Sequence, residues 1–246
     1  MEHVRVDRRD KVALVTLVDH ERRNAMTAGM VGEIVETFDA LEADDDIGAV
    51  VITGEPPAFC SGADVAALGS LSQGRDDGER RQVVSIYEGF LRVLRSSLPT
   101  VAAVNGPAVG AGLNLALACD VRLAGASARF DTRFLRIGLH PGGGHVWMLE
   151  RAVGPQAAAA MIMFGAPVSG ERAAEIGLAW ACHADDELID RAIEFAARAA
   201  TVPKELSAAA IETLREAPWQ PDFDAAVATE ISRQSWSLGK GWFQPR

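Results

Sequence analysis

The sequence predicts an α/β fold that ends in a helical carboxy-terminal region. Short apolar or β-branched runs, typical of buried strands, alternate with longer segments of helical periodicity, and turn-forming residues follow the strands. After Pro203 the apolar residues recur at helical spacing. Because 246 residues can bury one substantial core, we expect a core over residues 1–200 and a helical region over residues 201–246.

The elements of the core follow from their apolar patterns. Residues 4–6 alternate between apolar and polar, and residues 12–18 are apolar at nearly every position, which predicts a hairpin with a more buried second strand. Apolar side chains recur every three or four positions in residues 28–43, which predicts an amphipathic helix. Residues 49–53 and 101–104 are short β-branched runs, each followed by a turn and then a helical pattern.

One internal segment differs in composition from the predicted strands and helices. Residues 70–81 (SLSQGRDDGERR) are polar and contain glycine. Such a composition is typical of exposed loops, so we expect this segment to be exposed and mobile.

The overall composition favours a small-molecule partner in the cytoplasm. The formal net charge of −10 argues against nonspecific binding of nucleic acid. The charged amino terminus lacks the apolar core of a signal peptide, and no stretch approaches the roughly 20 apolar residues of a membrane helix. Cys60, Cys119 and Cys182 have no paired spacing, which indicates reduced thiols and neither a disulfide framework nor a metal site.

Four sequence blocks occur in the order found in one superfamily. They are residues 21–27 (ERRNAMT), 58–68 (AFCSGADVAAL), 104–120 (VNGPAVGAGLNLALACD) and 128–144 (ARFDTRFLRIGLHPGGG). With these blocks the chain resembles the crotonase, or enoyl-CoA hydratase/isomerase, superfamily over nearly its whole length. The resemblance implies a spiral of strand-strand-helix units, assembly as a homotrimer or hexamer, and coenzyme A as part of the substrate rather than as a tightly bound cofactor.

The small residues of two blocks fit the chemistry of a thioester. A reacting thioester develops negative charge on its carbonyl oxygen, which fixed backbone N–H groups stabilise where water is excluded. Glycines such as Gly62 and Gly110 let a substrate lie against the main chain. By their position in the motifs, the two donors are the N–H groups of Ala63 and Ala111. A helix that begins after Ala111 would add its partial positive charge. GPAVGAG does not have the GxGxxG spacing of a dinucleotide-binding loop.

The resemblance also shows which acidic residues this chain lacks. Hydratases of the superfamily carry two glutamates, and the matching positions here hold Asn114 and Phe134. An amide can orient a water molecule or bind a substrate but cannot accept a proton, and a phenyl ring can only pack. Ordinary hydration with two glutamates is therefore not expected.

Three other side chains are candidates for proton transfer. Asp131, His140 and His145 lie close in sequence to Phe134, and a histidine titrates near neutral pH. Each also has a structural alternative, because the histidines flank a glycine-rich turn, and Asp131 can cap the next turn or pair with Arg133 or Arg129. We expect Asp64 to hold the loop that presents Ala63.

The remaining candidates belong to substrate binding. We expect Phe134, Trp147, Met148 and Tyr87 to line the acyl pocket, and an arginine to contact a phosphate. The residues that we expect to flank the coenzyme A portion are Arg22, Arg23, Ala25, Ala58, Ser61, Gly62, Asp64 and Gly110.

The sequence thus predicts an acyl-CoA enzyme of the enoyl-CoA hydratase/isomerase type, in fatty-acid or related acyl-CoA metabolism. Two alternatives stay open at this point. One is an acyl-CoA-binding protein with little or no turnover, which the loss of both glutamates favours. The other is an isomerase or hydrolase of the same superfamily that uses another acid or base.

Overall fold

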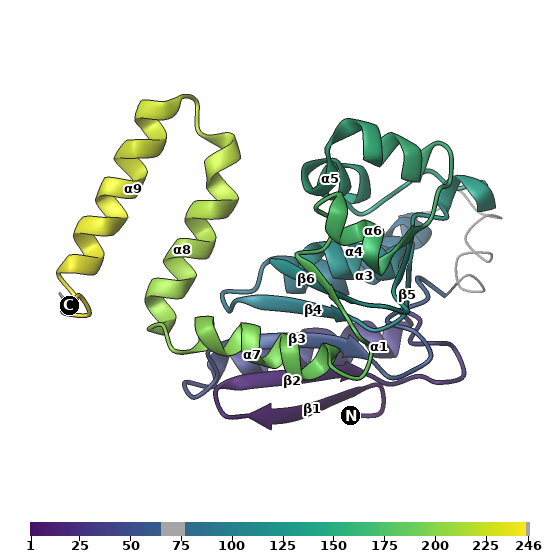
Figure 1. The fold of residues 1–246 in the computed structure, drawn as a ribbon, viewed down its shortest axis with the longest axis horizontal. Coiled ribbons are helices and arrows are strands. Elements are labelled where there is room, and N and C mark those ends of the chain that lie inside the picture. Colours follow the sequence, from purple (N-terminus) through teal and green to yellow (C-terminus); the bar gives the residue numbers. More distant parts are fainter. Residues whose placement is uncertain (65–76, 245–246) are drawn as a thin grey trace.

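The computed structural model describes residues 1–64 and 77–244, which form two sheets surrounded by helices (Figure 1). In the larger sheet a hairpin is followed by parallel strands, whose spatial order is β1 (Val4–Arg9), β2 (Val12–Leu17), β3 (Ala49–Gly54), β4 (Thr100–Val104), β6 (Val121–Gly125) and β9 (Ala181–His183). The smaller sheet contains β5 (Pro107–Val109), β7 (Arg129–Asp131) and β8 (Val168–Ser169). The predicted α/β class and amino-terminal hairpin are confirmed.

The helices connect the parallel strands and then extend beyond them. In chain order they are α1 (Ala28–Ala43), α3 (Asp77–Leu94), α4 (Ala111–Ala118), α5 (His145–Ile162), α6 (Gly170–Glu175), α7 (Leu188–Ala200), α8 (Lys204–Glu216) and α9 (Phe223–Leu238). Two short 3-10 helices, η1 (Phe134–Ile137) and η2 (Ala217–Trp219), lie between longer elements. The predicted helix over residues 28–43 is confirmed at both ends, and the hydroxyl of Thr27 caps its first turn.

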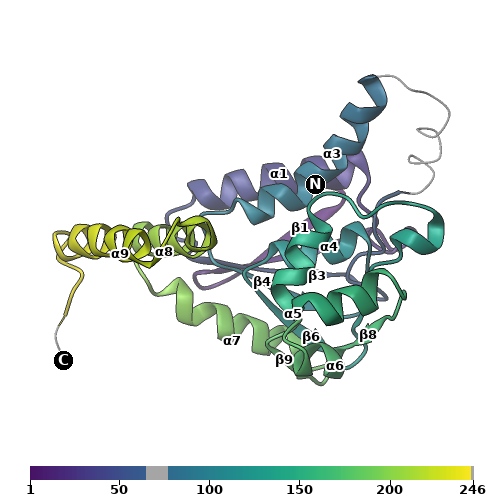
Figure 2. The ribbon, with the colours of Figure 1, turned by 90° about the horizontal axis from the view of Figure 1, so that it is seen from above.

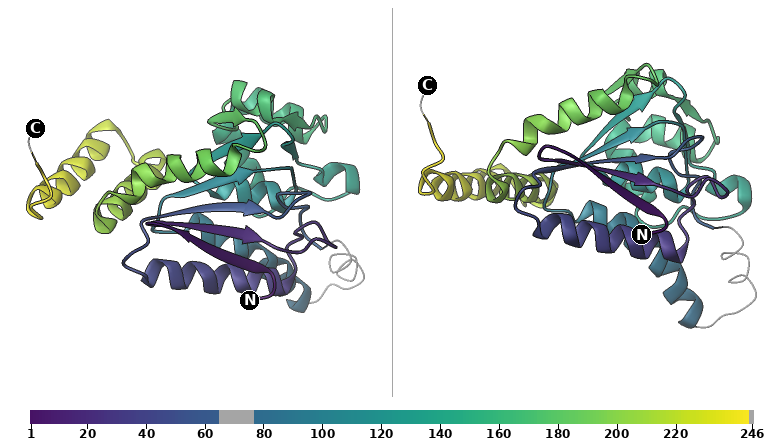
Figure 3. Two further views of the ribbon diagram at one scale, coloured as in Figure 1. Left: turned by 60° about the horizontal axis from the view of Figure 1, so that its bottom comes forward. Right: turned by 90° about the horizontal axis from the view of Figure 1, so that it is seen from below.

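The strands β2, β3 and β4 of the larger sheet are buried on both faces, which explains their nearly continuous apolar runs. Helices α1 and α3 lie along one face and α7 lies along the other (Figures 2 and 3). Successive residues of β3 point to opposite sides, so that Val50 packs toward α1 while Val51 packs toward α7. Because helices cover both of its faces, the sheet is a rigid base for the loops that emerge at its carboxyl edge.

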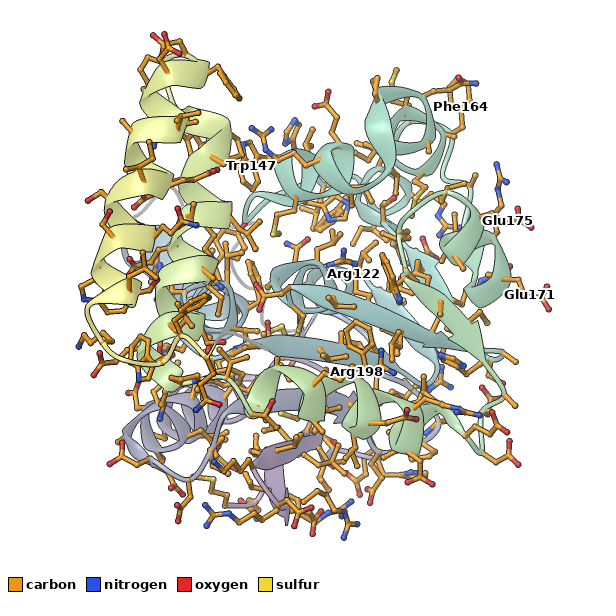
Figure 4. The ribbon with its side chains drawn as sticks, turned by 60° about the vertical axis from the view of Figure 1, so that its left-hand side comes forward. Arg122, Trp147, Phe164, Glu171, Glu175 and Arg198 are labelled. Atoms are coloured by element: carbon orange, nitrogen blue, oxygen red, sulfur yellow. The ribbon has the colours of Figure 1, made fainter. Side chains whose placement is uncertain are left out.

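Helices α8 and α9 form a hairpin that projects away from the sheets (Figure 1). The predicted division at residue 200 falls between α7, which ends at Ala200, and α8. Trp147 of α5 projects toward this hairpin (Figure 4), where its ring stacks on Trp219 with centroids 5.9 Å apart. The guanidinium carbon of Arg151 lies 4.1 Å from the Trp147 ring centroid, so the contact combines stacking with a cation–π interaction.

Part of the segment over residues 70–81, which we expected to be exposed and mobile, is helical. Residues 77–81 form the start of α3. Residues 70–76 lie outside the described residues. In the described part of the chain, no helix has both the length and the hydropathy needed to cross a membrane.

Candidate functional site

Two loops run side by side at the carboxyl edge of the larger sheet. Cys60 forms a parallel bridge with Ala108, and the Val109 N–H donates to the Cys60 carbonyl over 3.0 Å. Farther along, a Cβ added at Gly62, the residue before Ala63, would lie 3.8 Å from the Ala111 nitrogen. The two amides that the motifs single out therefore belong to adjacent backbone segments.

Glycines make this close approach possible. A Cβ added at Gly62 would lie 2.7 Å from the carbonyl oxygen of Val109, and one added at Gly112 would overlap the carbonyl oxygen of Cys60. Gly110 has a φ of 53° and immediately precedes α4, so the chain turns there into a helix whose first residue is Ala111. The amino terminus of α4, with its partial positive charge, thus lies at the same place.

The first sequence block fixes the loop that contains Ala63. The buried side-chain amide of Asn24 donates to the carbonyls of Glu55 and Ala58, each over 2.8 Å. The Met26 N–H donates to the Gly62 carbonyl over 2.8 Å, and the Ser61 hydroxyl donates to the Arg22 carbonyl over 2.8 Å. These bonds explain why two blocks far apart in sequence act as one structural unit.

A mainly apolar cavity of about 190 Å³ opens beside these loops. Ala63 and Ala111 both line it, together with Ser61, Gly62, Ile86, Tyr87, Val109, Gly110, Asn114, Thr132, Arg133, Phe134, Ile137, Leu139, His140 and Gly142. No carboxylate is among these described lining residues. The cavity therefore presents backbone amides and neutral polar groups to a ligand, with Arg133 as its one lining cation among them.

Asn114 and His145 form a buried hydrogen-bonded pair in the wall of this cavity. The Asn114 Nδ2 donates to the Gly142 carbonyl over 3.0 Å, while its Oδ1 lies 2.6 Å from the His145 Nδ1. The His145 ring also packs edge-on with Phe134, at 4.9 Å between centroids. His145 itself does not line the cavity, because Asn114 and Phe134 stand in front of it.

Burial of His145 should make the stability of the protein depend on pH. Burial lowers the pKa of its imidazole from 6.5 to about 4. Between pH 6.5 and about 4 the unfolded chain would bind a proton that the folded chain excludes, so the free energy of unfolding falls as pH falls. At about 1.4 kcal/mol per pKa unit, we expect a loss of about 3 kcal/mol from this residue.

Urea unfolding of the protein and of His145→Asn at pH 7.5 and pH 4.5 measures this effect. Asparagine keeps an N–H near the position of Nδ1 but does not titrate. Carboxylates with lowered pKa values also reduce the free energy of unfolding as the pH falls, but they do so in both proteins. The difference in pH dependence between the two proteins therefore isolates the contribution of His145. Equal pH dependence in the two proteins would contradict the prediction.

Asp131 is not among the lining residues of the cavity, and two arginines hold its carboxylate. Its carboxylate accepts from Arg133 Nη2 over 3.0 Å and from Arg136, and its Oδ1 also accepts the Arg133 N–H. Burial alone would raise its pKa, but the hydrogen bonds and charges of Arg136 and Arg133 keep the pKa below its ordinary value. Asp131 therefore makes the ion pairs of its structural alternative, with Arg136 rather than Arg129 as the second partner.

The other predicted residues lie either in the cavity wall or on and around the loops beside it. His140 lines the cavity, and its Nδ1 lies 2.7 Å from the Pro141 carbonyl, which requires Nδ1 to carry the hydrogen. Arg22 and Arg23 are exposed, and Arg22 pairs with Asp19 at 3.4 Å. Asp64 is half-buried directly after Ala63, and Ala25 and Ala58 are buried beneath the loops.

The expectation for the acyl pocket was wrong at two positions. Trp147 stacks on Trp219 instead of lining the cavity, and Met148 is buried in the core. Both residues lie on α5, which turns them away from the cavity. Phe134 and Tyr87, which the apolar pattern also placed in the acyl pocket, do line the cavity. Thr132 lines it without having been predicted, and no sequence signal singles it out.

Comparison with solved structures shows which fold contains this site. An enoyl-CoA hydratase from Polaromonas sp. JS666 superposes with a TM-score of 0.89 at 26% identity, over 96% of this chain and 91% of that one. A "putative enoyl-CoA hydratase" from Thermobifida fusca YX, in complex with acetoacetyl-CoA, gives a TM-score of 0.85 at 30% identity over 97% of this chain and 96% of that one. The fold is that of the crotonase superfamily, as the sequence blocks implied.

Sequence comparison gives the family. The family model described as Enoyl-CoA hydratase/isomerase matches residues 7–233. "Probable enoyl-CoA hydratase EchA14" of Mycobacterium tuberculosis is 50% identical over 204 residues, which cover 83% of this chain and 78% of that protein. The chain belongs to the enoyl-CoA hydratase/isomerase family, whose enzymes are lyases and isomerases.

Proposed function

We propose that this protein binds an acyl-CoA and polarises its thioester carbonyl between the N–H groups of Ala63 and Ala111. The observation that supports this proposal is the parallel alignment of the two segments, which brings both residues to the wall of one apolar cavity. The acetoacetyl-CoA bound to the Thermobifida fusca relative supports coenzyme A thioesters as the ligand class.

The polarised carbonyl makes the acyl chain reactive. Negative charge that develops on the thioester oxygen is stabilised by two fixed amides and by the amino terminus of α4. The α carbon becomes more acidic, and a double bond conjugated to the carbonyl becomes open to attack at the β carbon. Both consequences suit the lyase and isomerase chemistry of the family.

Proton transfer in this cavity falls to His140. Of Asp131, His140 and His145, it is the one that lines the cavity. Because its Nδ1 donates to the Pro141 carbonyl, its Nε2 carries a lone pair that can accept a proton from the acyl chain or from a water molecule. In this proposal the isomerase or hydrolase uses His140 as its base, and the two-glutamate mechanism of the hydratases does not apply.

Binding and turnover of defined ligands test this function. Butyryl-CoA should bind the protein at least about threefold more tightly than S-butyl-CoA, the thioether that lacks the carbonyl oxygen, because only the thioester can accept from the two amides. Conversion of crotonyl-CoA or longer enoyl-CoAs should be lost in His140→Gln without loss of butyryl-CoA binding. Equal affinity for thioester and thioether would contradict the proposed role of the amides.

A second candidate function is acyl-CoA binding without turnover. The specific observation in its favour is that the described lining residues include no carboxylate. Tight butyryl-CoA binding with no conversion of any enoyl-CoA would favour this function over the enzyme. The predicted homotrimer or hexamer stays a prediction in either case.

A further inference from the structure

The orientation of the Asn114 amide is fixed by its two neighbours. The Gly142 carbonyl can only accept a hydrogen bond, so the Asn114 atom 3.0 Å from it must be the NH₂ group. Oδ1 then faces His145, whose Nδ1 must carry the hydrogen that closes the 2.6 Å contact. With the amide reversed, two acceptor oxygens would face each other at Gly142.

In this orientation one N–H of Asn114 is left for a ligand. The NH₂ group has two hydrogens, of which Gly142 uses one, and Oδ1 accepts from the His145 Nδ1–H. Where a hydratase glutamate would present a negatively charged acceptor, this cavity wall therefore presents a neutral donor. A neutral donor favours an oxygen atom on the acyl chain over the activated water of a hydration reaction.

The helix places this donor close to the proposed thioester site. Ala111 and Asn114 are three residues apart in α4, and both line the cavity. Residues at that spacing lie on one helix face, about 4.5 Å apart along the axis. One short acyl chain lying against the start of α4 can therefore reach both the Ala111 amide and the Asn114 side chain.

We infer that the cavity recognises a 3-oxoacyl-CoA, with the C3 carbonyl accepting a hydrogen bond from Asn114 and with His145 as the positioning residue that orients the amide. This inference rests on the proposed thioester site and specifies its substrate class. The buried pair and the apolar lining explain the selectivity, because a saturated chain that fills this cavity would leave the Asn114 donor without a partner.

The test compares two ligands that differ only at C3. Isothermal titration should show acetoacetyl-CoA binding about 3- to 10-fold more tightly than butyryl-CoA, the effect of one neutral hydrogen bond. The ratio should fall to about one in Asn114→Leu. It should also fall in His145→Leu and be restored in His145→Asn, which keeps a donor near the position of Nδ1.

A measurement on the unaltered protein avoids dependence on variants that fold poorly. The infrared stretch of [3-¹³C]acetoacetyl-CoA should shift to lower frequency on binding, because a hydrogen bond weakens the C3 carbonyl. An unshifted band, equal affinity for the two ligands, or a ratio that survives in a folded Asn114→Leu would each overturn the inference. Failure of the proposed function is distinct, since it appears as equal affinity for butyryl-CoA and its thioether.

Discussion

Replacement of Ala111 by proline is expected to lower kcat/KM for an acyl-CoA substrate about 100- to 1,000-fold, the usual effect of removing one oxyanion donor. Ala111 is the first residue of α4, a position where proline fits helical geometry, so the change removes the N–H while the helix remains. Steady-state kinetics with an enoyl-CoA substrate measure the loss. If the protein binds without turnover, the readout is the affinity difference between butyryl-CoA and S-butyl-CoA, which should disappear.

Ala111→Gly is the matched control for this variant. It changes the same side chain but keeps the backbone donor, so it should retain most of the activity or of the affinity difference. Thermal unfolding of both variants shows whether α4 stays intact. Equal behaviour of Ala111→Pro and Ala111→Gly, with both folded, would contradict a role for this amide.

Replacement of Gly112 by alanine is expected to destabilise the protein by about 3 kcal/mol, near the upper end for overpacking a core. The added Cβ would overlap the Cys60 carbonyl, and backbone atoms cannot move aside as the end of a flexible side chain can. Relief of the overlap would separate the two loops that hold Ala63 and Ala111. We therefore expect ligand affinity and stability to fall together in this variant.

Gly32→Ala is the control for this prediction. Gly32 lies in α1 with nothing within 4 Å of an added Cβ, and alanine has the higher helix propensity, so a gain of about 0.5–1 kcal/mol is expected. Urea unfolding at pH 7.5 gives both values under one condition. A Gly112→Ala protein as stable as Gly32→Ala would show that the two loops do not pack as described.

Much of the fold could be predicted because its signals are local. The apolar pattern of residues 28–43 needed no tertiary contact to indicate α1, and the β-branched run at 49–53 indicated β3. The start of α3 at Asp77 was not predicted, since polar, glycine-containing residues carry no helical signal of their own. Tertiary packing of the apolar part of α3 extends the helix into them.

For the site, the sequence by itself determined which backbone segments we propose as the source of the two amides, because small residues such as Gly62 and Gly112 allow one chain segment to approach another closely. The resemblance of the sequence blocks also led to the prediction that Asn114 and Phe134 stand where hydratases carry two glutamates. Only the tertiary structure decided that Asn114 bonds His145, that arginines hold Asp131, and that His140 lines the cavity. Those contacts join side chains on separate elements, and their distances depend on how α4, α5, β7 and η1 pack rather than on any spacing along the chain.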